Sequence, residues 1–314
     1  MIADDSRSIA GLKGALRYVR AYRDHVFVVK LGGEILEKAD VRSRVAAQLA
    51  LLSSLGVRIV VVHGGGPQVT AVSQRLGIEP QIVAGRRITC EKTLDVVQMV
   101  IAGQLNTTLL STLRAEGIAV VGLTGVDAGL ICARKRPPTI IKDDAGVERT
   151  VDFGHVGDIV RVDPRVIHTL LDAGMVPVIG SLAGDDSGAI FNINADTLAE
   201  ALAVALRAQK LIFLTGAPGV LRDVRDPSTL VAFADPDDLA ALMQSGAIAG
   251  GMRPKVEACI RAATSGVERT HILDGRAADG LLFEVFTGAG CGTMIVGRKE
   301  KATYLGVDLA DGNR

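Results

Sequence analysis

The stretch Val26–Gly33, VFVVKLGG, is a run of apolar residues that ends in a pair of glycines. The same arrangement recurs where Arg58–His63 leads into Gly64-Gly65-Gly66, Val176–Ile179 into Gly180, and Leu211–Thr215 into Gly216. Such β-branched runs predict buried strands, and glycine lets the backbone turn sharply and expose its N–H groups. In an open α/β sheet, ligands bind at the carboxyl ends of the strands. The sequence therefore predicts a phosphate or nucleotide site that is spread over several strand ends.

Helical patterns alternate with these strands, at Val41–Leu55, Pro67–Leu76, Glu91–Ala115, Pro236–Gln244, Pro254–Ser265 and Arg276–Phe286 among others. This alternation predicts an α/β fold of three layers, with an open, mostly parallel sheet between two layers of helices. The polar stretch Thr124–Arg161 predicts hairpins. We divide the chain into an N-terminal helical extension (1–25), a first lobe (26–180), a second lobe (181–298) and a C-terminal tail (299–314). A central cleft is expected between the two lobes.

The composition excludes several classes of protein. The 314 residues contain 35 Lys and Arg against 35 Asp and Glu, so no net field attracts nucleic acid or an anionic membrane. Aromatic residues make up 3%, too few for a base-stacking platform. We see no signal peptide and no apolar stretch that approaches membrane-spanning length. Four widely separated cysteines without metal-ligand spacing indicate reduced thiols, so we expect a cytoplasmic protein with no protein-held metal.

Several motifs of nucleotide enzymes are absent from the sequence, including the P-loop and G-x-G-x-x-G. Phosphates would therefore be held by another arrangement. Three glycines followed by Pro67 place bare amides at a helix N-terminus, which is an anion site. Lys30 lies in an apolar strand beside Gly32-Gly33, where an ammonium group suits a transferring phosphoryl group. The alternative for Lys30, with equal weight, is a strand-end lysine that reaches solvent.

Two further segments combine charge with helix starts. In Asn192-Ile193-Asn194-Ala195-Asp196, helix capping explains one of the three polar residues but not all. Lys255 follows Gly250-Gly251 in the first turn of a helix, where the helix dipole disfavours a cation, so a phosphate ligand explains it better. Arg86-Arg87 could bind a carboxylate through a two-pronged contact, and its alternative is a solvated surface pair.

Nine motifs occur in a fixed order along the chain: VVKLGG (28–33), VVHGGGPQ (61–68), GRRIT (85–89), GLTGVDAG (122–129), FGHVGDI (153–159), FNINAD (191–196), LTGAPGVL (214–221), GGMRPKVEAC (250–259) and HILDGR (271–276). Together they resemble the N-acetylglutamate kinases of the amino acid kinase family, from about Leu12 to Val296. The resemblance implies the fold of that family. It also implies transfer of the γ-phosphoryl group of ATP to the side-chain carboxylate of N-acetyl-L-glutamate, the second step of arginine biosynthesis.

The resemblance also implies roles for particular residues. Lys30 and Lys255 would neutralise the transferring phosphoryl group, and Asp196 would hold the two lysines in place. Phosphate would be bound by Gly32, Gly33, Gly64 and Gly65; acetylglutamate by Gly65, Gly66, Arg87 and Asn192; and the nucleotide by Thr215, Gly216, Gly219, Leu221 and Lys255. Mg²⁺ would be held mainly by the phosphates. A carboxylate acceptor is already ionised at neutral pH, so no general base is expected.

The chain departs from the family pattern at two places. The family usually has Asp where this chain has Gly216, so an acceptor for the nucleotide or hydrated Mg²⁺ would be missing. The stretch Ala277–Asp279 also differs, away from the chemistry. Family members that arginine inhibits have an N-terminal helix like Leu12–Tyr22, which joins dimers into hexamers. The resemblance therefore implies a homo-oligomer, a dimer or a hexamer, with an arginine site formed by Tyr18, His271, Glu284 and Gly290.

Two other functions remain open on the sequence. A kinase for another acylated acidic amino acid, such as N-acetyl-aminoadipate, would differ by one methylene, which is worth only about 1–3 kcal/mol. A catalytically silent, kinase-like regulatory module is the other alternative. Gly216 favours that module, whereas the joint presence of Lys30, Asp196 and Lys255 argues against it.

Overall fold

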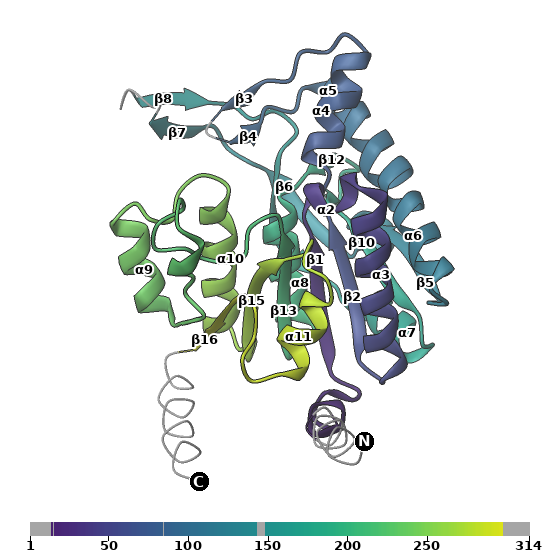
Figure 1. The fold of residues 1–314 in the computed structure, drawn as a ribbon. Coiled ribbons are helices and arrows are strands. Elements are labelled where there is room, and N and C mark those ends of the chain that lie inside the picture. Colours follow the sequence, from purple (N-terminus) through teal and green to yellow (C-terminus); the bar gives the residue numbers. More distant parts are fainter. Residues whose placement is uncertain (1–13, 15, 84, 143–147, 298–314) are drawn as a thin grey trace, which may run out of the picture.

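The structure is a computed structural model that describes residue 14 and residues 16–83, 85–142 and 148–297. Its centre is an eight-stranded sheet in the order β14-β16-β15-β13-β1-β2-β10-β5 (Figure 1). The strands of this sheet are β1 (Val26–Leu31), β2 (Arg58–His63), β5 (Val120–Thr124), β10 (Val176–Gly180), β13 (Lys210–Thr215), β14 (Phe233–Ala234), β15 (Arg269–Asp274) and β16 (Thr293–Val296). Every neighbouring pair is parallel except β15 with β16. The predicted mostly parallel sheet is therefore confirmed.

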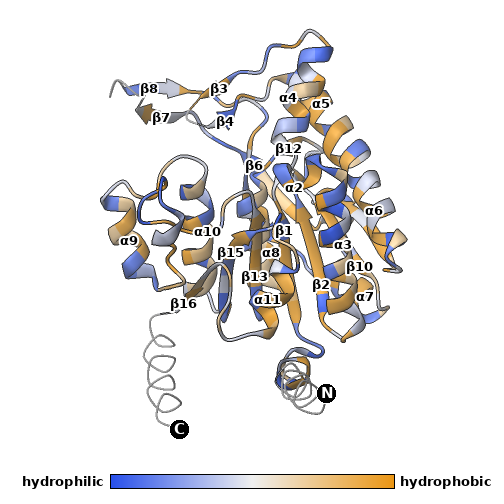
Figure 2. Cartoon of the chain, viewed as in Figure 1, coloured by the Kyte–Doolittle hydropathy of each residue, from blue (hydrophilic) through white to orange (hydrophobic). Residues whose placement is uncertain are grey.

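Helices cover both faces of this sheet. They are α2 (Gly33–Glu37), α3 (Ala39–Ser54), α4 (Gly66–Arg75), α5 (Glu91–Gln98), the π-helix η1 (Met99–Leu105), α6 (Asn106–Ala115), α7 (Arg165–Asp172), α8 (Ala195–Ala205), α9 (Pro236–Gln244), α10 (Met252–Thr264) and α11 (Gly280–Phe286), with the short 3₁₀ turns η2 (Asp127–Gly129) and η3 (Pro227–Thr229). Successive residues of a strand point to opposite faces. Val28 accordingly packs in the cluster that contains α8 and α10, and Val29 in the cluster that contains α3 and α6. Figure 2 shows the resulting apolar strands in the middle layer.

The polar middle of the chain forms smaller antiparallel units, as its hairpin signals predict. A four-stranded sheet has the order β12-β11-β6-β9, and the pairs β3-β4 and β7-β8 are two-stranded. The strands are β3 (Ile82–Val83), β4 (Arg86–Arg87), β6 (Ile131–Lys135), β7 (Thr139–Lys142), β8 (Glu148–Val151), β9 (Gly157–Val162), β11 (Leu182–Gly184) and β12 (Ile190–Asn192). In Figure 1 the β3-β4 and β7-β8 pairs project beyond the carboxyl ends of the central strands.

The long helix predicted over Glu91–Ala115 is continuous, but its middle is the π-helix η1. By length and composition this segment is apolar enough to cross a membrane, which the sequence reading did not anticipate. Its apolar residues include Val97, Ile101 and Leu109, which are buried in the core beneath the sheet. A core helix of a globular protein meets the same criterion, so the finding is weak evidence for a membrane span.

Several elements differ from the prediction; α3, for example, begins at Ala39 rather than Val41, and α4 begins at Gly66 rather than Pro67. The short helix α2 was not predicted, and α10 begins at Met252 rather than Pro254. Helix α11 begins at Gly280 rather than Arg276, because Asp279 has a left-handed backbone with φ of 54°. Of the N-terminal helix, residues 16–22 are described as helical, and Leu12 lies outside the described residues. The division into lobes stays a prediction.

Candidate active site

Lys30, Asp196 and Lys255 meet at the carboxyl end of β1. The Nζ of Lys30 lies 2.8 Å from Oδ1 of Asp196, and the Nζ of Lys255 lies 3.3 Å from Oδ2. The Lys255 ammonium also donates to the carbonyl of Gly251. Lys30 and Asp196 are each only 8% exposed at the side chain. Two cations on one carboxylate leave a net charge of +1, so the cluster is suited to attract an anion.

Asp196 stays ionised despite its burial. Burial alone would raise the pKa of its carboxyl group, but the charges and hydrogen bonds of Lys30 and Lys255 outweigh burial and hold the pKa below its ordinary value. Asn194 caps α8, since its Oδ1 accepts from the amides of Asp196 and Thr197. Capping therefore accounts for Asn194, and the ion pairs account for Asp196.

The glycine loops converge on the same place. A Cβ atom at Gly33 would lie 2.8 Å from Cδ of Pro67, and a Cβ atom at Gly64 would lie 3.2 Å from Cβ of Ala195. The N-termini of α2, α4 and α8 therefore approach one another beside the lysines. Helix N-termini present unpaired N–H groups and a partial positive charge, which both favour an anion. The convergence forms a cradle of the kind that a phosphate requires.

Arg87 and Asn192 lie at the edge of this cradle. One Nη of Arg87 donates to the carbonyl of Gly66 at 3.0 Å and to Oγ1 of Thr70 at 2.6 Å. Its other Nη is buried and has no hydrogen-bond partner among the described residues. The side-chain amide of Asn192 donates to Oγ1 of Thr89. Hydrogen bonds therefore hold the Arg87 side chain in place, and one of its N–H donors is left for a ligand. Arg87 is not the solvated surface residue of the alternative interpretation.

The loop after β13 lies beside the first glycine loop. The amide of Gly32 donates to the carbonyl of Leu214 at 2.9 Å, and the Thr215 hydroxyl is engaged with Ala217 in its own loop.

Further along the loop, Gly219 has φ of 152°, and a Cβ atom there would lie 2.6 Å from Oγ1 of Thr293. Leu221 forms a bridge with Leu230. These contacts hold the predicted nucleotide loop against β16 and Leu230.

Glu34 occupies the space beside Gly216. A Cβ atom at Gly216 would lie only 1.7 Å from Oε2 of Glu34. The carbonyl of Gly216 accepts from Arg276, which also pairs with Asp274. The sequence predicts that the acidic side chain of the family is missing at position 216. In the structure α2 places the Glu34 carboxylate where the side chain of residue 216 would lie.

The four residues assigned to an arginine site are close together. Nδ1 of His271 lies 2.7 Å from Oε1 of Glu284, and a Cβ atom at Gly290 would lie 2.9 Å from Oε2 of Glu284. Tyr18 stacks on Tyr22 with 6.0 Å between the ring centroids, and its hydroxyl lies near Gly288.

Sequence reasoning missed Lys210, which belongs to the same cluster. Its Nζ lies 3.2 Å from Nε2 of His271 and 5.0 Å from the centre of the Tyr22 ring. Burial is the main reason that the pKa of Lys210 falls to about 7, and Arg269 adds to the effect. Burial likewise lowers the pKa of His271 to about 4. The neutral ring donates from Nδ1 to Glu284 and accepts from Lys210. A lysine as the first residue of an apolar strand was the available signal.

Gln68 was quoted in a motif but given no role. Its Nε2 donates to the carbonyl of Gly33 at 2.9 Å, while no described residue forms a hydrogen bond with its buried Oε1. Gln68 therefore ties the two glycine loops together and leaves one acceptor unpaired beside them.

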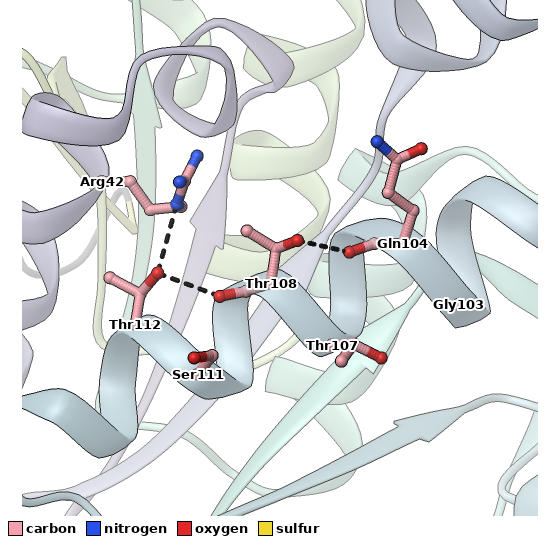
Figure 3. Close-up of a pocket in the computed structure, with 7 residues that line it drawn as sticks. All are labelled: Arg42, Gly103, Gln104, Thr107, Thr108, Ser111 and Thr112. Atoms are coloured by element: carbon pink, nitrogen blue, oxygen red, sulfur yellow. Dashed lines mark hydrogen bonds between the residues drawn. The ribbon is translucent and has the colours of Figure 1, made fainter.

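Two surface depressions lie away from this cluster. One, of about 630 Å³, is lined by Arg42, Gly103, Gln104, Thr107, Thr108, Ser111 and Thr112 (Figure 3). The hydroxyls of Thr108 and Thr112 donate to the backbone of their own helix, and Arg42 donates to Thr112. The other, of about 600 Å³, lies between α9 and α10. Neither depression contains a predicted site residue.

Comparison with known proteins agrees with this geometry. Residues 25–274 match the model of the amino acid kinase family. Acetylglutamate kinase from Myxococcus xanthus is 49% identical over 91% of this chain and 94% of its own length. N-acetylglutamate synthase from Neisseria gonorrhoeae, complexed with coenzyme A and N-acetyl-glutamate, superposes with a TM-score of 0.78 at 28% identity, over 92% of this chain and 63% of that one. The same enzyme complexed with coenzyme A and L-arginine gives a TM-score of 0.76 at 28% identity, over 92% and 65%. The chain belongs to the amino acid kinase family.

Proposed function

We propose that the protein phosphorylates the side-chain carboxylate of N-acetyl-L-glutamate with ATP, the second step of arginine biosynthesis. The single observation that carries the proposal is the buried Asp196, which holds Lys30 and Lys255 beside converging helix N-termini. Relatives at 42–49% identity over at least nine-tenths of the chain carry the name acetylglutamate kinase, which supports the substrate.

In this mechanism a carboxylate oxygen of acetylglutamate attacks the γ-phosphorus of ATP. The bond from that phosphorus to the β–γ bridging oxygen breaks, and ADP leaves with the electron pair. Lys30 and Lys255 offset the negative charge on the transferring group, and the amides of Gly33 and Gly65 donate to its oxygens. Arg87 and Asn192 hold acetylglutamate in line.

Mg²⁺ would lie on the phosphates of ATP. Among the described residues, no three His, Cys, Asp or Glu side chains are grouped so that they could hold a metal ion. The donor set of the described residues therefore does not fit a metal centre formed by their side chains alone. When bound with ATP, Mg²⁺ would offset charge on the phosphates, as is general for kinases.

An assay of ADP release tests the proposal and its alternatives together. Purified protein with ATP and Mg²⁺ is expected to release ADP with N-acetyl-L-glutamate, and much less with N-acetyl-aminoadipate or free glutamate. Faster release with N-acetyl-aminoadipate would move the assignment to that substrate. No release above background with any of the three would favour the silent regulatory module.

We also propose that L-arginine binds near Tyr18, His271, Glu284 and Gly290 and inhibits the enzyme. The proximity of these residues supports it, as does the arginine complex of the related synthase. We further propose a homo-oligomer, a dimer or a hexamer, joined in part by the N-terminal helix. In the described part of that helix, Leu16 is 43% exposed.

A further inference from the structure

His63 is a buried residue that the proposed chemistry does not use. It ends β2, has no exposed surface and lies directly before the three glycines. Its Nδ1 lies 3.0 Å from the carbonyl oxygen of Gly64, and its Nε2 lies 3.1 Å from Nδ2 of Asn106. The imidazole therefore bridges the glycine loop and the end of the π-helix.

The protonation state of the ring follows from these partners. A carbonyl oxygen can only accept, so Nδ1 of His63 carries the proton. The same Nδ2 of Asn106 lies 3.1 Å from the carbonyl oxygen of Val178, which can only accept. The atom of Asn106 that faces both groups is therefore the amide nitrogen and not the amide oxygen. Nε2 of His63 therefore accepts from Asn106. Burial, together with the charge of Lys30, lowers the pKa of His63 to about 4, in agreement with a neutral ring.

This hydrogen bond fixes the direction of one amide. The peptide between Gly64 and Gly65 is trans and planar, so its N–H points opposite to its C=O. With the carbonyl held against His63, the N–H of Gly65 points away from the ring. In the described part of the chain this N–H makes no hydrogen bond, although Gly65 is buried. A buried, unpaired amide is costly unless a ligand accepts from it.

The opposite side of Gly65 is closed by the π-helix. A Cβ atom at Gly65 would lie 2.2 Å from Cδ1 of Leu105 and 2.8 Å from Cδ1 of Ile101. Ile101 also lies 2.8 Å from the position of a Cβ atom at Gly180. The π-helix therefore places two apolar side chains against the loop and positions Asn106 to hold His63.

We propose that His63, held by Asn106, is a positioning residue that aims the Gly65 amide at the transferring phosphoryl group. It touches neither substrate and exchanges no proton in the reaction. This inference rests on the proposed function. It adds that the π-helix contributes to the rate of transfer through Ile101 and Leu105, which pack against the glycine loop.

Two substitutions at His63 distinguish orientation of the Gly65 amide from a purely structural role of the side chain. His63→Asn retains a donor near the position of Nδ1, whereas His63→Gln reaches toward Asn106 and loses the donor to Gly64. We expect His63→Gln to lower kcat about 10-fold to 100-fold, less than the loss of an amide donor itself. His63→Asn should retain most of kcat, and the KM values for ATP and acetylglutamate should change less than about threefold in both.

A second readout does not depend on turnover. Binding of ADP with aluminium fluoride and N-acetyl-L-glutamate, which mimics the transferring group, should weaken in His63→Gln by the same factor as kcat. Binding of ATP alone, with substrate omitted, should not change. Asn106→Asp should reproduce the loss, because an oxygen then faces both Nε2 of His63 and the carbonyl of Val178. His168→Gln, an exposed histidine on α7, serves as the control and should match the wild type.

Equal kcat values for His63→Gln and His63→Asn would overturn the proposal, as would a loss of kcat no larger than the loss of folded protein. A failed proposed function has a different signature, since the wild-type chain itself would then release no ADP.

Discussion

At the scale of single residues, the pairing of Asp196 with two lysines is the feature on which activity should depend most. Lys30→Ala and Lys255→Ala are each expected to lower kcat about 100-fold to 1,000-fold with much smaller changes in KM, because the charge they offset develops during transfer. Asp196→Asn should lower kcat similarly, since both lysines lose their anchor. Steady-state kinetics measure these values.

Thermal unfolding of the same variants controls for damage to the fold. Asp196→Asn leaves the buried ammonium group of Lys30 and the partly exposed one of Lys255 without an anion and should also lower Tm. An unchanged kcat in either lysine variant would remove that lysine from the mechanism. Arg87→Ala should instead raise the KM for acetylglutamate, because Arg87 acts in binding.

Lys210 gives the protein a pH-dependent stability. Its pKa is about 7 in the folded chain against 10.5 for an ordinary lysine, so between these values the unfolded chain binds more protons. The free energy of unfolding should therefore gain up to about 1.4 kcal/mol per pH unit from this group as pH rises above 7, and level off above 10.5. The cost of burying the charge is fully present below pH 7.

Lys210→Met should remove this contribution. Urea unfolding at pH 7, 8, 9 and 10 is expected to give a flatter profile for the variant than for the wild type. Parallel profiles would mean that Lys210 is protonated in the folded chain throughout this range.

At the scale of elements, helix α2 and the loop that follows β13 meet at one point, where the Glu34 carboxylate occupies the space beside Gly216. Gly216→Asp alone should raise the KM for ATP, because the new side chain meets the Glu34 carboxylate sterically and electrostatically. Glu34→Ala combined with Gly216→Asp should recover a KM near that of the wild type. KM values for ATP across the wild type, both single variants and the double variant measure this coupling.

Gly103→Asp is the matched control for the added charge, since a Cβ atom at Gly103 meets no described atom outside the backbone of its own helix within 4 Å. A lower KM in Gly216→Asp alone would show that Glu34 moves aside readily and that the space is not exclusive.

The sequence was most informative where periodicity and glycine act together. Strand β1 and helix α9 were predicted with the bounds that the structure has. An apolar run that ends at Gly32 delimits β1, and Pro236 marks the first residue of α9. The π-helix η1 was not predictable, since local propensity does not distinguish it from an α-helix and packing against Gly65 accompanies it. The contact between Glu34 and the position of Gly216 could not be predicted for a related reason. The two residues are far apart in the sequence and meet only when the sheet has formed.

At the scale of the whole molecule, the N-terminal helix contributes Tyr18 to the predicted arginine site. Tyr22 is buried against Phe27, and Tyr18 stacks on Tyr22. We expect the full chain to form a homohexamer built from three dimers, and we expect L-arginine to inhibit it. A chain beginning at Asp24 should form only dimers and lose the inhibition, because it lacks both the helix and Tyr18.

Light scattering and activity with and without arginine test this expectation on both chains. Equal dimer masses, together with activity that arginine leaves unchanged in the full chain, would restrict the helix to packing on its own subunit.

The order of strands in the central sheet also has a consequence for synthesis on the ribosome. Strand β1 lies between β2 and β13, and the latter is made roughly 180 residues later. During translation the edge of Val26–Leu31 that later pairs with β13 therefore remains unpaired. An unpaired, apolar strand edge is the kind of surface that aggregates or binds chaperones. The same delay keeps the nascent chain inactive, because Lys30 meets Asp196 and Lys255 only near the end of synthesis. Slowing translation before Lys210 should accordingly increase aggregation more than slowing it after Val296.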